Sequence, residues 1–210
     1  MRLPDHWGRS FVKPVAPELA AMNAAAAWAW LAGELTAAVG SARHGLHLLT
    51  VATVGADGQP DARTVVLRHV DPLRREIRFH SDIRSPKVQT LRTSPRVALH
   101  WYDPALRVQV RVAAVAAIHH GDTVATAAWT ASQTMSRAIY TTTVAPGDAL
   151  DAFPEGPAAP AADDDTGLGR FVVVACRFDT VELLSLHAAG HQRVRLHLDC
   201  DPITWTVLAP

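Results

Sequence analysis

The pattern of apolar and polar residues predicts one long helix followed by a series of strands. Residues 17–39 are rich in alanine and leucine, and their large apolar side chains recur at helical spacing, which indicates a helix with one buried stripe. From Leu46 onward, β-branched residues and alternation indicate strands separated by turn residues. We expect these strands at residues 46–55, 62–70, 75–81, 96–102, 106–118, 170–178, 180–186 and 192–198.

Two shorter segments carry helix start signals. In residues 85–95, Ser85 suits the cap position and Pro86 suits the first turn. Residues 121–140 are also rich in helix formers, with Asp122 as the candidate cap. Both segments are therefore expected to interrupt the strands as helices.

The order of these elements favours a mainly β fold with flanking helices, an antiparallel β-barrel, because strands and helices do not alternate regularly. The strand at 106–118 becomes a continuous apolar run, so we expect its end to be buried on both faces. The length of 210 residues suits a single domain spanning 1–210. Residues 144–169, rich in Ala, Pro, Gly and Asp, predict a flexible loop.

Composition argues against several classes of function. The chain has 19% charged residues and no net charge, so a general attraction to nucleic acid or to anionic membranes is not expected. No segment approaches the roughly 20 apolar residues of a membrane span. Cys176 and Cys200 lack neighbours at metal-ligand spacing, and the N-terminus lacks a secretory pattern. We therefore expect a cytoplasmic protein with reduced cysteines and no metal.

Cationic and hydroxyl side chains gather around the predicted helix at 85–95. Ser85 and Lys87 lie at its start, where unpaired backbone N–H groups favour an anion, and Ser81 ends the preceding strand. The guanidinium groups of Arg63 and Arg68 match phosphate oxygens in geometry. One phosphate monoester would account for the set. Alternatively, the arginines pair with acids at the barrel rim, and in a regular strand two residues five apart face opposite sides.

Other polar residues leave more than one interpretation open. Gln109 lies in an otherwise apolar or cationic strand, and Gln133 and Thr134 lie late in a helical segment. Each either binds a flat heterocycle or is a satisfied structural group. A C-terminal histidine group matches no common spacing of metal ligands: His187, His191 and His197. No Walker loop, Gly-x-Gly-x-x-Gly or Gly-x-Ser-x-Gly motif is present, which argues against nucleotide hydrolysis and serine hydrolysis.

The order and spacing of several segments resemble the pyridoxamine 5′-phosphate oxidase family of FMN-binding split-barrel flavoproteins. These segments are "GQPDARTVVLRHVD", "RFHSDIRSPKVQTLRTSPRVALHWYDPALRVQVRV", "WTASQTMSR" and the terminal "VLAP". The resemblance runs from about Leu46 to Arg137 and resumes near the C-terminus. It implies an antiparallel split barrel and a homodimer with FMN at the interface between subunits.

The resemblance also implies which residues contact FMN. The family's Arg-x-x-Leu-Leu-Lys pattern corresponds to residues 63–68, with Arg68 in place of the usual Lys. Its Tyr-Thr pair becomes His80 and Ser81, and its Ser-Arg-Lys becomes residues 85–87, which loses one arginine. The implied cofactor site consists of Arg63, Thr64, Val65, Val66, Leu67, Arg68, His80, Ser81, Ser85, Lys87, Gln109, Gln133, Thr134, His187 and His197.

On the substrate side the chain departs from the family. Ala116, His120 and Val124 stand where the family has a Tyr, an Arg and a Ser that bind the substrate's phosphate. Arg193 and Arg195 are the candidates for contacting the substrate, and no catalytic residue is assigned. We therefore expect an FMN-dependent oxidoreductase that transfers hydride to or from an unassigned small molecule other than pyridoxamine 5′-phosphate.

Two alternatives remain open from the sequence. The chain could bind FMN without catalysis, as a storage or sensing protein. It could also hold haem or a metal on the same barrel, with the C-terminal histidines as ligands.

Overall fold

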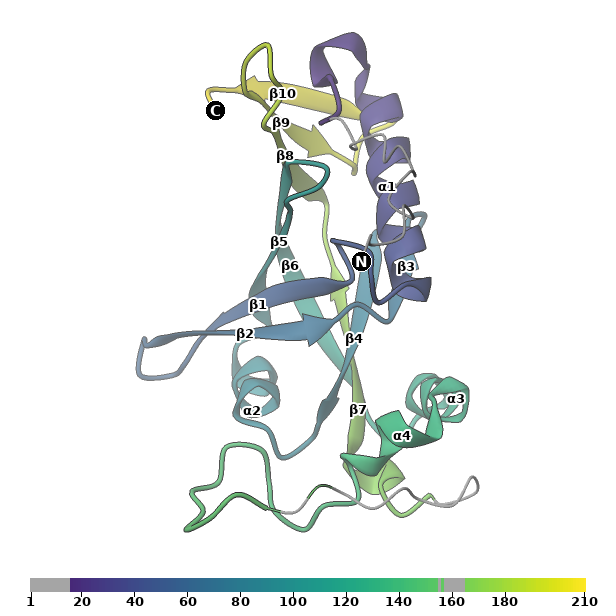
Figure 1. Cartoon of the computed structure of the whole chain (residues 1–210), viewed down its shortest axis with the longest axis vertical. Coiled ribbons are helices and arrows are strands. Elements are labelled where there is room, and N and C mark those ends of the chain that lie inside the picture. The colour runs from purple at the N-terminus through teal and green to yellow at the C-terminus, as the bar shows by residue number, and fades with distance from the viewer. Residues whose placement is uncertain (1–15, 155, 157–164) are drawn as a thin grey trace, which may run out of the picture.

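One antiparallel sheet dominates the protein (Figure 1). The computed structural model describes residues 16–154, 156 and 165–210. Within these residues the sheet has ten strands, and all of its pairings are antiparallel. The strands are β1 (Leu48–Val54), β2 (Pro60–Val66), β3 (His69–Asp71), β4 (Glu76–Asp82), β5 (Arg96–Asp103), β6 (Val108–His119), β7 (Phe171–Arg177), β8 (Thr180–Ser185), β9 (Gln192–His197) and β10 (Thr204–Leu208).

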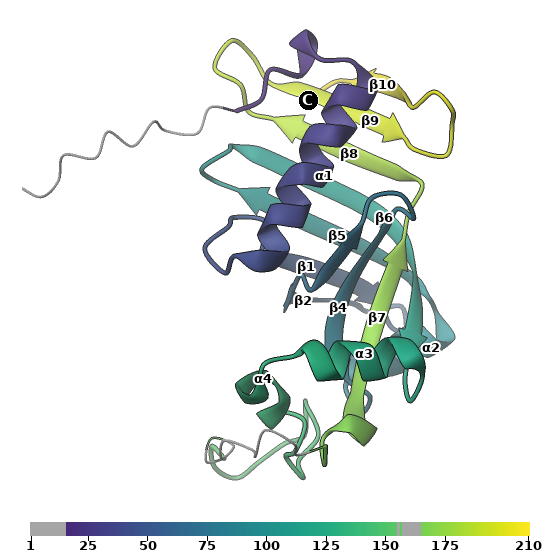
Figure 2. The ribbon, with the colours of Figure 1, turned by 90° about the vertical axis from the view of Figure 1, so that its right-hand side faces the viewer.

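The long strand β6 joins two parts of the sheet (Figure 2). Its residues 108–111 pair with β8, whereas residues 115–119 pair with β7. Through β8 the sheet continues to β9 and β10, and through β7 it turns to β4 and β3. The sheet curls into a half-barrel around the main core, which confirms the expected mainly β, antiparallel split-barrel fold.

Helix α1 (Ala24–Gly40) begins later than predicted. Asn23 accepts a hydrogen bond from the Ala26 N–H at 2.8 Å, and this cap sets the start because it satisfies an otherwise unpaired donor. Pro17 instead precedes a single 3₁₀ turn, Leu19–Ala21. The apolar stripe of α1 packs into the main core, as the spacing predicts.

The segment 121–140, predicted as one helix, is two helices: α3 (Thr123–Ala131) and α4 (Thr134–Ala138). Asp122 caps α3 as expected, accepting from the Ala125 N–H at 2.9 Å. The helix breaks because Ser132 and Gln133 adopt extended backbone conformations, with ψ of 143° and 144°. Helix α2 (Pro86–Thr93) lies at the same end of the molecule as α3 and α4 (Figure 1).

The strand predicted at 62–70 is interrupted. After β2 ends, the Leu67 N–H donates to the His47 carbonyl, and the Arg68 N–H donates to the Arg78 carbonyl. The chain thus leaves β1 and joins β4. The alternation of side chains along β2 orients Arg63, but it does not fix the side on which Arg68 lies. The final strand, Thr204–Leu208, was not predicted.

The prediction that the end of β6 is buried on both faces was wrong for the single chain. Ala114 is buried, but Ala113 and Val115 are exposed, because the barrel interior covers only one face. Ala113 lies opposite Ala98 of β5, which lies opposite Ala52 of β1. We call this region the open sheet face; it comprises Ala52, Val54, Ala98, Ala113 and Val115.

Residues 144–154 contain no helix or strand. The rest of the predicted flexible loop, 144–169, includes residues 155 and 157–164, which lie outside the described residues, as do residues 1–15. The flexibility of the loop and the single domain over 1–210 therefore stay predictions. Cys176 is buried, Cys200 is exposed, and both are free, as expected. None of the described helices is long and apolar enough to span a bilayer.

Candidate functional site

A small cavity of about 310 Å³ lies between β2, β4, the start of α2 and the segment after α4. Residues that the sequence predicts as cofactor ligands meet here: Thr64, Val65, Val66, Arg68, His80, Ser81 and Lys87. The remaining wall is formed by Asp82, Ile139, Tyr140 and Pro146. The cavity is therefore the place where most of the predicted phosphate-binding groups lie together.

Lys87 has the surroundings of an anion-binding residue. Burial, followed by the positive charge of Arg63, lowers the pKa of its ammonium group. A bound anion would offset both effects by stabilising the charged form. Lys87 also lies in the first turn of α2, directly after Pro86, where backbone N–H groups lack helical partners.

Two serine hydroxyls support this end of the cavity. Ser85 occupies the cap position of α2, as predicted, but its hydroxyl does not cap the helix. It lies 3.1 Å from the Ser81 hydroxyl, and both residues are buried. Only Ser81 lines the cavity, so Ser85 lies behind it.

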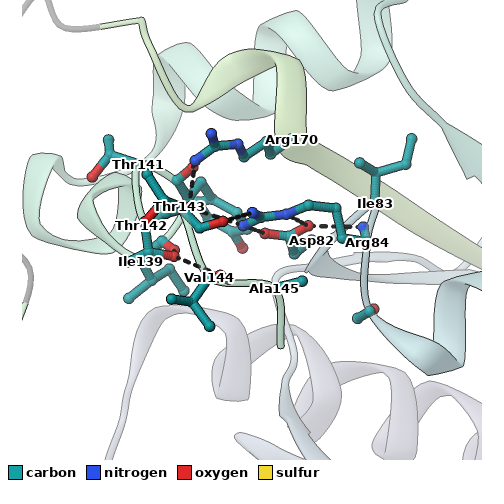
Figure 3. Close-up of polar contacts among 12 residues, drawn as sticks. Asp82, Ile83, Arg84, Ile139, Thr141, Thr142, Thr143, Val144, Ala145 and Arg170 are labelled. Atoms are coloured by element: carbon teal, nitrogen blue, oxygen red, sulfur yellow. Dashed lines mark hydrogen bonds and ion pairs between the residues drawn. The ribbon is translucent and has the colours of Figure 1, made fainter. Parts of the chain in front are cut away.

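The cavity also holds a carboxylate that sequence reasoning missed. Asp82 is buried, and Arg84 pairs with it at 2.7 Å (Figure 3). In the sequence the only signal is an acid two residues before an arginine at a strand end, in "FHSDIRSP". Nothing in that spacing shows that the pair faces a cavity.

A second cavity of about 600 Å³ adjoins the first, because Arg68 and His80 line both. Its other walls come from β3, β4 and the two helices α3 and α4. Gln133 lines it, whereas Thr134 does not. The wall contributed by α3 is mostly apolar: Val124, Ala127, Ala128 and Ala131.

His80, at the junction of the two cavities, is neutral at physiological pH. Burial, followed by the positive charge of Arg68, lowers its pKa to about 4. A neutral imidazole offers one donor and one acceptor nitrogen. The ring packs edge-on against Phe171 with centroids 4.7 Å apart, which fixes its position.

We expect the ligand-free protein to lose stability as the pH falls from 6.5 to about 4, in part through His80. In that window an unfolded histidine binds a proton and the folded one does not, so protons favour unfolding by up to about 2–3 kcal/mol. Thermal melts across this range should show a shallower decline for His80→Gln. The exposed His191→Gln variant should follow the wild type, and equal slopes for all three would contradict the assignment.

Arg63 does not line either cavity. Its guanidinium donates to the Thr53 hydroxyl at 2.9 Å and to the Val51 carbonyl at 3.2 Å, and it pairs with Asp61. It thus braces the β1–β2 hairpin beside Lys87. Leu67 is fully buried in the core and likewise does not line a cavity. Contact of either side chain with FMN stays a prediction.

The other predicted residues lie at a different part of the sheet. Strand alternation places Gln109, Arg193, Arg195 and His197 on the same side of the sheet as Ala113. Arg193 and Arg195 both pair with Glu182 at 2.6 Å. The other candidate, His187, follows β8 in a turn. A single chain therefore does not bring these residues to the two cavities.

The histidine group considered for a metal is not assembled. In the part of the chain that the structure describes, no three His, Cys, Asp or Glu side chains are placed to hold a metal ion. His187 accepts a hydrogen bond from the Ala189 N–H, and His197 contacts the Thr206 hydroxyl at 3.0 Å. Among these described residues, the metal-ion alternative thus lacks its ligand set.

Comparison with known proteins supports the family resemblance. The family model "Pyridoxamine 5′-phosphate oxidase, FMN-binding domain" matches residues 26–120. Residues 26–120 therefore resemble the FMN-binding domain of this family. The family expected from the motifs, and FMN as its cofactor, are confirmed.

Individual relatives are similar over part of their length. The pyridoxine/pyridoxamine 5′-phosphate oxidase of Caulobacter vibrioides is 42% identical over 66 residues, which is 31% of this chain and 29% of that protein. The enzyme of the same name from Thermosynechococcus vestitus is 40% identical over 78 residues, 37% of this chain and 36% of that protein. The alignment thus spans only about a third of these relatives.

Two solved structures share the fold. A pyridoxamine 5′-phosphate oxidase-related, FMN binding protein from Nostoc punctiforme matches with a TM-score of 0.73 and 21% identity, covering 87% of this chain and 97% of that chain. PhzG from Burkholderia lata, solved with tetrahydrophenazine-1-carboxylic acid, matches with a TM-score of 0.64 and 18% identity, covering 87% and 89%.

The donors around the small cavity fit the family's cofactor. Lys87, Arg68 and the hydroxyls of Thr64 and Ser81 suit a phosphate ester. Burial raises the pKa of Tyr140 to about 12, so its phenol also keeps its proton. The adjoining larger cavity, with its apolar α3 wall, suits a flat ring.

Proposed function

We propose that the protein is an FMN-dependent oxidoreductase that acts on a small molecule. One observation carries this proposal: a cavity rich in cationic and hydroxyl groups opens, at Arg68 and His80, into a larger cavity with an apolar wall. A ligand with an anionic tail and a flat ring system needs a cationic cavity next to an apolar one. A barrel without a ligand does not need two such cavities.

In this proposal Lys87, Ser81 and Thr64 hold the phosphate, with Ser85 and Arg63 supporting them from behind. Bound FMN supplies hydride acceptance and donation. Neutral His80 and cationic Arg68 orient groups at the junction. The substrate and the flavin ring share the larger cavity, where the apolar wall of α3 excludes water.

The cationic side of the larger cavity favours a substrate that carries negative charge. Arg68 is exposed there, and among the described residues its side chain forms no ion pair. His69 lies on the same wall, and so does Arg78, which pairs with Glu76 at 2.7 Å. Val124, where the family has a serine, leaves less polar contact on the facing helix, so we do not expect pyridoxamine 5′-phosphate as the substrate.

We further propose that the protein functions as a homodimer. The open sheet face is mainly apolar across three strands, with the exposed Arg96 opposite Val115, and one of its rows is Ala52, Ala98 and Ala113. Thr64, at the small cavity, lies in the sheet row next to Ala62 and faces the same side. A second copy on this face would cover the alanines and bring Gln109 and His197 towards the cofactor.

The test is to purify the protein with its native ligand and record its absorbance spectrum. Flavin bands that follow FMN addition support the proposal, whereas a Soret band or no flavin binding would overturn it. The photoreduced holoprotein is then mixed with oxygen, quinones and candidate amines. FMN binding without turnover of any acceptor would favour the storage or sensing alternative.

A further inference from the structure

An acidic side chain in a cavity that binds phosphate needs a physical explanation. Asp82 is only 6% exposed and lines the small cavity together with Lys87. The two are within electrostatic reach, because the Asp82 charge acts to raise the pKa of Lys87. An uncompensated carboxylate at this position would repel the phosphate that the cavity is proposed to hold.

Arg84 compensates this charge by donating hydrogen bonds to both carboxylate oxygens of Asp82. Its Nε donates to Asp82 Oδ1 at 3.0 Å, its Nη2 donates to Oδ2 at 2.7 Å, and its backbone N–H donates to Oδ1 at 2.8 Å. Burial acts to raise the pKa of Asp82, but the hydrogen bonds from Arg84 outweigh it and lower the pKa. Asp82 is therefore ionised and bound in the fork of one guanidinium.

The same guanidinium also bonds the segment after α4, which contributes another wall of the cavity. Its Nη1 donates to the Thr143 carbonyl at 2.9 Å, and Nη2 donates to the Thr142 carbonyl at 3.1 Å. Arg170 approaches from the other side and donates to the carbonyls of Thr142 and Tyr140. Figure 3 shows Arg84 lying between Asp82 and this segment.

That wall has no regular structure of its own. Residues 139–146, which contribute Ile139, Tyr140 and Pro146 to the cavity, form no helix or strand. Their position relative to β4 therefore depends on side-chain contacts: Tyr140 packs against Phe171 with ring centroids 5.1 Å apart, and Arg84 donates two hydrogen bonds.

We propose that Arg84 is a positioning residue that neutralises the Asp82 carboxylate and fixes the 139–146 wall, so that phosphate binds beside a buried acid. This inference rests on the proposed FMN site. It predicts that loss of the Arg84 charge weakens binding of the phosphate and not of the flavin ring. The ring carries no negative charge that an unmasked Asp82 carboxylate would repel.

The test measures dissociation constants for FMN and for riboflavin, which has the same ring system without the phosphate. For Arg84→Gln we expect FMN affinity to fall about tenfold or more, with a much smaller change for riboflavin. Asp82→Asn should bind FMN as tightly as the wild type or more tightly. The double variant Asp82→Asn with Arg84→Gln should recover most of the lost affinity.

The pair of exposed Arg74 and half-buried Asp71, at 3.8 Å, offers a control, and Arg74→Gln should change neither constant. A merely structural role for Arg84 would weaken FMN and riboflavin equally, without recovery in the double variant, and would overturn the inference. Should Arg84→Gln fail to fold, Asp82→Asn decides alone: weaker FMN binding by this folded variant refutes charge masking. Absence of FMN binding by the wild type would refute the proposed function and this inference together.

Discussion

Lys87→Met is expected to lower the affinity for FMN by about 100-fold while affinity for riboflavin changes little. The ammonium group is buried and lies near the positive charge of Arg63, so a bound anion would stabilise its charged form. Loss of a charge-assisted hydrogen bond in such a site costs about 1.5–3 kcal/mol. Without the lysine, the Ser81 hydroxyl would remain as a weaker donor to the phosphate. Methionine keeps the length and apolar stem of the side chain, so α2 should remain packed.

Fluorescence quenching of each flavin on titration with protein measures both constants. Arg92→Met, in the exposed last turn of the same helix, is the control, because it removes a cation from α2 far from the helix start. We expect the control to bind like the wild type. Parallel losses of FMN and riboflavin in Lys87→Met would contradict a phosphate role for this lysine.

Three of the candidate phosphate-binding residues could be grouped from the sequence, because they are local. Ser81, Ser85 and Lys87 span the junction of one strand and one helix, and a helix start places such groups together whatever the rest of the fold does. Arg68 is also predicted from the sequence, but the way in which it reaches the same cavity as Lys87 is not. Its usefulness depends on the chain changing partner after β2, and hydrophobic alternation does not record that change.

Long-range contacts account for what the sequence did not predict. Asp82 and Arg84 appear in sequence as a local acid–base pair, yet Arg84 also bonds a segment nearly sixty residues away. Likewise, the apolar run of β6 was read as buried on both faces, because composition cannot say whether the second face is covered by the same chain or by another copy. For the same reason, the sequence cannot say whether Gln109 and His197 reach the cavity of their own chain or that of another copy.

Ala113→Glu is expected to convert a homodimer into monomers and to abolish most FMN binding. Ala113 lies next to Ala98, which lies next to Ala52, so glutamate would place a charge at the end of this apolar row. Burying that charge unpaired against a second copy would cost several kcal/mol. In the isolated chain the position is exposed, so the monomer should stay folded. Light scattering and FMN titration measure the two effects.

Ala37→Glu, on the exposed face of α1, is the control for adding a carboxylate and should change neither assembly nor FMN affinity.

The loss of dimerisation and the loss of FMN binding in Ala113→Glu should also be linked. If the cofactor contacts residues from both copies, saturating FMN must favour the dimer by mass action, and a milder Ala113→Ser variant should dimerise more fully with FMN than without it. A monomeric wild type that binds FMN tightly, or an Ala113→Glu monomer with full FMN affinity, would show that one chain suffices. Gln109 and His197 would then have no part in the cofactor site.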